Sequence, residues 1–343
     1  MQKLILFTFD YELFLGERSG KVTDCLIQPT NKLLELLGEF QFKGIFFVDT
    51  VWLLMMKKIM DAHPKVKADF ESVVAQLISI VKQGHYIFPH IHGHWLDAEY
   101  LAEENQWSLR NTRYYQFASL PREEQENLFD SSISILYCVA RTAGMPMKLD
   151  SYRAGGWSIQ PFDSFKPFFQ KYGIWNEFSV LPGRYHISDA HQYDFRKAPI
   201  DQPVYRFSDD VCSKDDSGPY TEWTISSLGM TSQQQWIDFR ISGLLHRLRI
   251  TGKQRGKVIS SRTTEEGDIY KKKLASRWLA SFEGLHPYRV SLYSKLIQDA
   301  SYFQFISHPK LIDEYELKMI YRLFRIIRTN KNIETDFRKA GNA

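Results

Sequence analysis

Apolar residues along the chain follow two alternating patterns. Short continuous apolar runs are typical of strands buried on both faces, and apolar residues three or four apart are typical of helices. Because helices between buried strands let those strands run in the same direction, the alternation predicts an α/β fold with a parallel sheet. The expected strands are 4–9, 44–48, 86–88, 147–152, 173–180, 220–225 and 302–306. The expected helices are 28–40, 52–60, 68–83, 122–143, 162–172, 233–249, 288–300 and 312–327.

Three segments follow neither pattern, and we expect them to be excursions from the sheet: 97–121, 181–220 and 247–273. The polar tail after Arg328 is expected to fray. A chain of 343 residues can form one large domain or two smaller ones. Since neither a linker nor an internal repeat interrupts the alternation, we expect a single domain over residues 1–343.

The composition is that of an ordinary globular protein, with 43% apolar and 24% charged residues. A net charge of +4 is too small to indicate nucleic-acid binding. The three cysteines, Cys25, Cys138 and Cys212, are widely spaced and predict no disulfide framework, which fits a reducing compartment. The N-terminal residues lack the pattern of a signal peptide, and no apolar run reaches the length of a membrane span. We therefore expect a cytoplasmic protein.

Polar residues with catalytic potential follow the expected strands. Asp10 and Glu12 lie two apart after the first strand, so their side chains should project together. The third strand leads into Gly84–Trp95, a segment with His90, His92 and His94. On a helical turn, His90 and His94 would share a face and could bind a divalent metal. The alternatives are a solvated turn for Asp10 and Glu12 and a solvated histidine-rich loop for Gly84–Trp95.

Two further residues, Arg153 and His308, also follow expected strands. The carboxyl ends of parallel strands meet at one edge of a sheet, where the active sites of α/β proteins lie. The shared placement of these residues is therefore a stronger signal of a catalytic site than any one of them.

Five motifs, in order along the chain, resemble those of the polysaccharide deacetylase family, the NodB-homology carbohydrate esterases. They are Thr8–Glu12, Gly84-His85 with His90-x-x-x-His94, Arg153–Trp157, Tyr220–Trp223 and Ile306–His308. The chain departs from the usual pattern in two places. Its acidic pair is Asp-x-Glu, as in one branch of the family, where the usual pattern has two adjacent aspartates. Gly-Gly-Trp stands where many relatives have Pro-Tyr.

The resemblance implies a distorted (β/α) barrel, typically of seven parallel strands, and a divalent metal, most simply zinc, with cobalt or nickel as alternatives. The implied roles are a catalytic base (Asp10), an arginine that orients it (Arg153), an acid (His308), and metal ligands Glu12, His90 and His94. His92 could replace either histidine ligand or contact substrate. The other implied substrate contacts are Trp95, Trp157, Glu222 and Trp223.

The activity implied by the resemblance is removal of the N-acetyl group from an amino sugar. A cytoplasmic location would favour a nucleotide- or lipid-linked intermediate over a finished polymer. A C–N hydrolase acting on a cyclic imide or ureide, and a non-catalytic carbohydrate-binding relative, are the alternatives; the joint presence of Asp10, Arg153 and His308 argues against the second. The basic residues of 247–273 fit either a solvated insertion or contact with an anionic inner membrane leaflet.

Overall fold

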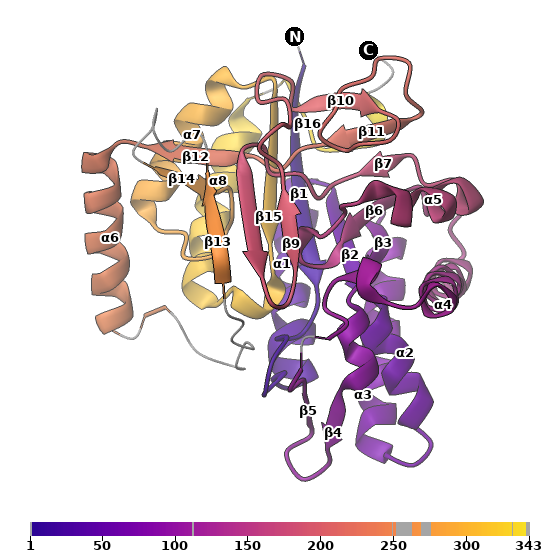
Figure 1. Cartoon of the computed structure of the whole chain (residues 1–343). Coiled ribbons are helices and arrows are strands. Elements are labelled where there is room, and N and C mark those ends of the chain that lie inside the picture. The colour runs from indigo at the N-terminus through magenta and orange to yellow at the C-terminus, as the bar shows by residue number, and fades with distance from the viewer. Residues whose placement is uncertain are drawn as a thin grey trace.

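The computed structural model describes residues 2–111, 113–248, 250–251, 263–268, 276–330 and 332–340 (Figure 1). Its central sheet contains seven parallel strands in the spatial order β11-β7-β6-β3-β2-β1-β15. Each of them overlaps one of the strands expected from the sequence. Their bounds are β1 Lys3–Tyr11, β2 Gly44–Asp49, β3 Tyr86–Ile91, β6 Ser151–Ala154, β7 Asn176–Glu177, β11 Tyr220–Trp223 and β15 Tyr302–Ser307.

The sheet curls into a distorted (β/α) barrel, as predicted, but the described residues contain no backbone ladder between β11 and β15. The segment after β11 bridges the gap. The Tyr302 hydroxyl donates to the Thr224 carbonyl (3.0 Å), and the backbone N–H of Gln304 donates to Ser226 Oγ (2.9 Å). On the far side of β11, β10 (Val204–Phe207) adds an antiparallel edge strand.

Two groups of helices pack around the sheet. The first group is α1, α7 and α8, and the second is α2, α3 and α4. Their bounds are α1 Gln28–Phe40, α2 Thr50–Ile59, α3 Pro64–Lys82, α4 Arg122–Thr142, α7 Pro287–Asp299 and α8 Glu314–Thr329, and a short α5 spans Lys166–Tyr172. In α8, Asp313 and Glu316 form a capping box, and Leu317, Ile320 and Leu323 are buried. This spacing of three residues places the apolar side chains on the face toward the sheet.

Contrary to the prediction of a frayed tail, residues 332–340 form secondary structure that packs on the barrel. β16 (Ile333–Glu334) pairs in parallel with the start of β1, and α9 (Phe337–Ala340) follows. The buried ring of Phe337 contacts the rings of Tyr86, Phe88, Phe178 and Trp223. The buried ring of Phe337 and the β16 ladder therefore hold a segment whose composition is otherwise mostly polar.

The excursions contain small structures of their own. The first holds the hairpin of β4 (Glu99–Leu101) and β5 (Gln106–Ser108). In the second, β8 (Arg184–Ser188) and β9 (Gln192–Asp194) form a sheet with β13 (Thr263–Asp268). The strand β12 (Ser227–Met230) and the helix α6 (Ser232–Arg247) precede the third excursion in the sequence, and β14 (Ser276–Leu279) follows it. β12 and β14 pair with each other.

Most of the basic residues of the third excursion lie outside the described residues: Arg249, Lys253, Arg255, Lys257, Arg262, Lys271, Lys272 and Lys273. Their predicted role as a group is therefore not examined by the structure, and the single-domain organisation also stays a prediction. Among the described residues, no helix has both the length and the apolar character needed to cross a bilayer.

Candidate active site

The polar residues expected at the strand ends come together at one end of the barrel. The sheet register pairs His90 on β3 with Arg153 on β6, and Phe9 on β1 with Ser307 on β15. The residues that follow the second pair, Asp10 and His308, therefore lie at the same level of the barrel. Because parallel strands deliver their carboxyl ends to one edge, residues distant in sequence meet here.

A cavity of about 300 Å³ opens at this end of the barrel. Acidic, imidazole and aromatic side chains form its wall. The lining residues are Asp10, Glu12, Leu15, His90, His92, Tyr115, Gly156, Trp157, His186, His191, Tyr193 and His308. The volume is at the lower end of the range for small-molecule sites.

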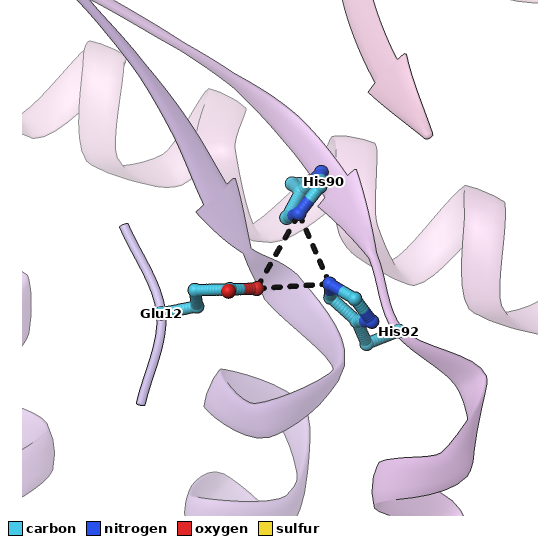
Figure 2. A group of neighbouring side chains, drawn as sticks. All are labelled: Glu12, His90 and His92. Atoms are coloured by element: carbon cyan, nitrogen blue, oxygen red, sulfur yellow. Dashed lines mark hydrogen bonds and ion pairs between the residues drawn. The ribbon is translucent and has the colours of Figure 1, made fainter. Parts of the chain in front are cut away.

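Three of these residues, Glu12, His90 and His92, point their side chains at one another (Figure 2). Glu12 Oε2 lies 2.8 Å from His92 Nε2 and 3.4 Å from His90 Nε2. The two Nε2 atoms are 3.0 Å apart. All three side chains are buried. Among the described residues, they form the group of His, Cys, Asp and Glu side chains whose ligand atoms converge as a metal site requires.

The donor set of this triad fits a divalent cation. His90 Nδ1 lies 2.9 Å from the carbonyl oxygen of Arg153. Because a carbonyl oxygen only accepts, Nδ1 carries the hydrogen, and Nε2 of the neutral ring presents a lone pair to the centre. This hydrogen bond behind the ring is typical of a histidine that binds a metal. Two imidazole nitrogens and one carboxylate oxygen suit zinc and also cobalt or nickel.

The histidine pair in the triad differs from the predicted pair, because His92 stands where His94 was expected. The prediction assumed a helical turn, in which residues four apart share a face. The chain instead stays extended from β3 through His92 (φ −111°, ψ 93°), so residues two apart point the same way. His94 lies one turn further, in the short helix Gly93–Asp97, with its ring stacked on that of Tyr115 (4.7 Å between centroids).

Asp10 is held by the buried guanidinium of Arg153. Arg153 Nη1 donates to Asp10 Oδ1 (2.6 Å), Nη2 donates to Thr8 Oγ1 (2.9 Å), and Nε donates to the carbonyl of Phe178 (3.0 Å). Burial acts to raise the pKa of Asp10, but Arg153, with smaller effects from His90 and His308, outweighs it and lowers that pKa below its ordinary value. Asp10 is therefore an ionised carboxylate at neutral pH.

His308 is oriented by Glu283, a residue that the sequence did not indicate. Glu283 Oε1 lies 2.6 Å from His308 Nδ1 and also accepts from the His308 backbone amide (2.9 Å). His308 Nε2 is then 3.6 Å from Asp10 Oδ2 and 3.4 Å from Glu12 Oε1. Burial acts to lower the pKa of His308, but the Glu283 carboxylate outweighs it, and the pKa is raised.

Lys310 is a second residue that sequence reasoning missed. It lies in the 3-10 helix Pro309–Leu311, two residues after His308, and is buried. Its Nζ donates to Glu12 Oε1 (2.7 Å) and to the carbonyl of Leu13 (2.7 Å). Burial acts to raise the pKa of Glu12, and Lys310 followed by His92 outweighs it, so that the pKa is well below its ordinary value. Glu12 therefore offers Oε2 to the triad as a carboxylate while Oε1 is bound by Lys310.

The two glycines after Arg153 allow close approach to the triad. A Cβ at Gly155 would lie 2.4 Å from the carbonyl oxygen of Ile91 and 2.9 Å from His92 Nδ1. A Cβ at Gly156, which has a φ of +59°, would lie 2.6 Å from the ring of Tyr115. Any side chain at either position would displace a wall of the cavity, which is the reason for the Gly-Gly sequence.

Only some of the residues predicted to contact substrate line the cavity. Trp157 and His92 line the cavity, whereas Trp95, Glu222 and Trp223 do not. Trp95 is fully buried and its indole N–H donates to Asp49, a carboxyl whose pKa burial raises to about 8. The substrate contacts of these three residues stay predictions. Trp95 lies in the short helix Gly93–Asp97, Glu222 and Trp223 lie on β11, and all three side chains are buried.

The structure adds Tyr115, His186, His191 and Tyr193, which belong to no motif, to a wall of packed rings that also includes His94 and Trp157. Tyr115 comes from the first excursion, and its ring stacks on both His94 and His191 (4.7 Å between centroids in each case). His191 stacks in turn on His186 of β8 (4.7 Å), and Trp157 meets Tyr193 edge to face (5.6 Å). Only the aromatic content of the excursions hinted at this wall, and composition cannot identify its members.

No family model matches the sequence, and no curated protein matches it. Solved structures with a similar fold include a putative polysaccharide deacetylase from Mycobacterium smegmatis, with a TM-score of 0.48 and 12% identity over 100% of this chain and 90% of that one. Another is a family 4 carbohydrate esterase from Streptomyces lividans in complex with acetate (TM-score 0.40, 12% identity, 98% and 92% covered). A third is Puue allantoinase (TM-score 0.45, 10% identity, 98% and 88% covered).

The first two structures carry the name of the family that the sequence motifs resemble. The branch with the Asp-x-Glu spacing is not represented among these names.

Proposed function

We propose that the chain is a metal-dependent hydrolase that removes the N-acetyl group from an amino sugar, in a polysaccharide or its biosynthetic intermediate. The observation that carries the proposal is the arrangement around Asp10. One of its oxygens is bound by Arg153, and the other lies 3.6 Å from His308, beside the triad of Glu12, His90 and His92. A base, an acid and a metal triad within one cavity are the groups that amide hydrolysis requires.

We assign the metal to Glu12, His90 and His92, with His92 in place of His94. A divalent ion bound there would polarise the acetyl carbonyl and lower the pKa of a water, toward about 7 in favourable zinc sites. Glu12 is suited to this role because Lys310 occupies its second oxygen and leaves Oε2 directed at the two histidines.

Asp10 acts as the general base in this proposal. Its pKa is held low, so it is ionised at neutral pH, and it accepts a proton from the attacking water. Arg153 keeps the carboxylate oriented, which is a positioning role.

His308 acts as the general acid. Glu283 fixes its tautomer through Nδ1 and favours the imidazolium, and Nε2 faces the cavity side where Asp10 and Glu12 lie. It donates a proton to the departing amine, which would otherwise leave as a poor anion.

The aromatic wall favours a sugar as the substrate. Trp157, Tyr193 and Tyr115 offer apolar ring faces and edges, while His186 and His191 offer hydrogen-bonding atoms beside them. This mixture suits a ring with both hydroxyl groups and apolar C–H faces. A cavity of about 300 Å³ suits one sugar residue with its acetyl group, and a nucleotide- or lipid-linked precursor is the form that we propose.

The same imidazole-rich rim favours one alternative. His186 and His191 could hydrogen-bond to the planar edge of a cyclic imide or ureide, whose hydrolysis needs the same base, acid and metal triad. A non-catalytic binding protein is disfavoured because such a protein needs neither the Asp10–Arg153 pair nor His308.

A substrate panel tests the proposal. Metal-loaded protein is incubated with N-acetylated oligosaccharides, a nucleotide-linked N-acetyl sugar, and a cyclic ureide, and the released acetate and opened ureide are measured. We expect acetate from at least one N-acetyl sugar and none after chelation. Ureide opening without acetate would establish the alternative, and binding of a sugar without turnover would contradict both hydrolytic functions. The substitution Asp61→Asn, at an exposed loop position, serves as a control for Asp10→Asn.

A further inference from the structure

Helix α6 lies at the edge of the molecule (Figure 1). Several of its large apolar side chains are exposed to solvent. Trp236 is 64% exposed, Phe239 74%, Leu244 56%, and Leu248, directly after the helix, 58%. Within α6 itself, only Asp238 is buried. In a globular protein, such a cluster of exposed apolar residues on one element marks a surface that contacts something else. Below, the exposed face of α6 means Trp236, Phe239, Arg240, Leu244, Arg247 and Leu248.

The charged residues on the exposed face of α6, Arg240 and Arg247, are both positive. Asp238 is the only acidic residue between 231 and 264, and its carboxylate is bound by Arg289 (2.7 and 2.8 Å) and His286 (3.0 Å). This contact anchors α6 to α7. The exposed face carries Arg240 and Arg247, and the sequence adds five more basic residues before Glu265: Arg249, Lys253, Arg255, Lys257 and Arg262.

We propose that the exposed face of α6 docks the protein on an anionic lipid bilayer. A helix with aromatic and aliphatic side chains on its free face and cations beside them is suited to the interface between lipid headgroups and acyl chains. The basic residues add electrostatic attraction to anionic headgroups. A second copy of the chain is a poorer partner, because a self-complementary contact between two such faces would bring cations together without any exposed carboxylate to pair with them.

The first described strand after α6 is β13, which pairs with β8 and places Glu266 Oε2 3.5 Å from Nδ1 of His186 on the cavity wall. The docking proposal does not depend on the chemistry proposed for the site, because it rests on the apolar and basic residues of α6 alone.

The test is co-sedimentation of the full chain with vesicles of phosphatidylcholine, with and without phosphatidylglycerol, at low and high salt. We expect binding to anionic vesicles at least about tenfold stronger than to neutral ones at low salt, and residual binding at high salt from the apolar residues. The double variant Trp236→Ser/Phe239→Ser should lose the residual binding. The variant Arg240→Gln/Arg247→Gln should weaken the low-salt binding by roughly tenfold and keep the high-salt part.

Tyr137→Ser/Met145→Ser is the matched control, because both side chains are 44% exposed and lie elsewhere, on and after α4. It should bind as the unmodified chain does. Equal binding to both vesicle types, or full binding by Trp236→Ser/Phe239→Ser, would overturn the proposal. So would a concentration-dependent dimer that this variant abolishes without any vesicle binding, which would make a second copy the partner. Thermal melts verify that each variant is folded. Acetate release from a water-soluble substrate should be unchanged in all of them, so a failure of the docking proposal can be distinguished from a failure of the proposed catalytic function.

Discussion

Two pairs of carboxyl groups are buried in the barrel, and their surroundings differ. Asp10 and Glu12 follow one strand at the cavity, whereas Glu177 on β7 and Glu222 on β11 face each other within the sheet. Arg153 binds Asp10 and Lys310 binds Glu12. Glu177 and Glu222 instead accept hydrogen bonds from uncharged groups: the Ser179 backbone amide donates to Glu177 Oε2 (2.8 Å), and the Val180 backbone amide donates to Glu222 Oε1 (3.2 Å).

The pKa values of the two pairs move in opposite directions for this reason. Burial raises the pKa of every one of the four groups, but cations reverse the effect for Asp10 and Glu12. For Glu222, Arg153 acts to lower the pKa but does not outweigh burial and the neighbouring Glu177, so the pKa is well above its ordinary value. For Glu177, burial outweighs the hydrogen bonds that act to lower the pKa, which is raised. A buried base or metal ligand therefore needs a cation close enough to outweigh the effect of burial.

The largest expected effect is that of Asp10→Asn. The substitution keeps the shape but removes the ionised base, so kcat should fall by about 10²–10⁴-fold. Metal content, measured by elemental analysis, should stay the same because the triad is intact. Asp61→Asn should change neither quantity. Loss of metal from Asp10→Asn would mean that Asp10 is a ligand and that the two acids at the cavity have exchanged roles.

Next, His92→Ala and His94→Ala distinguish the two histidine arrangements. Removal of His92 should weaken metal binding by more than about 100-fold, since even the partners of metal ligands are worth about 10–100-fold. His94→Ala should leave the affinity nearly unchanged, because its ring stacks on Tyr115 outside the triad. Isothermal titration with zinc measures both, and a loaded His92→Ala beside an empty His94→Ala would restore the pair expected from the sequence.

Removal of the cation next to Glu12 tests why that acid stays ionised. Lys310→Met leaves a buried carboxylate without its partner, and breaking such a pair costs about 3–5 kcal/mol of unfolding free energy. Bound metal should reduce this loss, because the ion supplies the missing positive charge. Lys32→Met removes the exposed Lys32–Glu314 pair and should cost about 0–1 kcal/mol with or without metal. Equal losses in the two variants would contradict the role given to Lys310.

The smallest effect is expected from Glu222→Gln. A glutamine can reproduce the hydrogen bonds of the protonated carboxyl, so the free energy of unfolding at pH 4 should change by about 1 kcal/mol or less. The folded-state pKa of Glu222 is raised, so in the unmodified chain this group costs stability as the pH rises above 4.5, where the unfolded state ionises. Glu222→Gln should therefore become more stable relative to the unmodified chain between pH 4 and pH 7.

Asp10→Asn should show the opposite pH dependence in the metal-free protein. The lowered pKa of Asp10 gives a stabilising contribution above the unfolded-state value of 3.8, and it is lost as the pH falls through the folded-state pKa. Denaturant melts at pH values above and below 3.8 compare the free energies of unfolding of the two variants. Glu39→Gln, on the exposed side of α1, is the neutral control. The same sign of pH dependence for both variants would contradict the distinction between the pairs.

The sequence was sufficient for features that depend on local pattern. The bounds of α1, Gln28–Phe40, coincide with the expected helix, and the seven strands from β11 to β15 in the sheet order were located, although the parallel strand β16 was not. The gathering of Asp10, Arg153 and His308 followed from one rule, that parallel strands end at one edge. The packing of the C-terminal tail on the barrel did not follow from it, because the burial of Phe337 depends on rings from three distant segments.

The rest of the site depends on the tertiary course of short segments. Whether His92 or His94 joins His90 depends on how far the chain stays extended after β3, and the local sequence allows both. Glu283 and Lys310 come from connections whose direction no periodic pattern determines. That Glu222 does not line the cavity could not be predicted, because an acid on a strand looks the same in the sequence whether it faces a cavity or another buried carboxyl.

The most direct test of the account is a metal titration of acetate release. Protein freed of metal by chelation is titrated with zinc in the presence of an N-acetylated oligosaccharide, and acetate is measured at each step. We expect no release without metal, a rise that ends at one equivalent of zinc per chain, and zinc binding without release in Asp10→Asn. Acetate release that is independent of metal, or a fully loaded chain that releases acetate from none of the N-acetyl sugars in the panel, would contradict it.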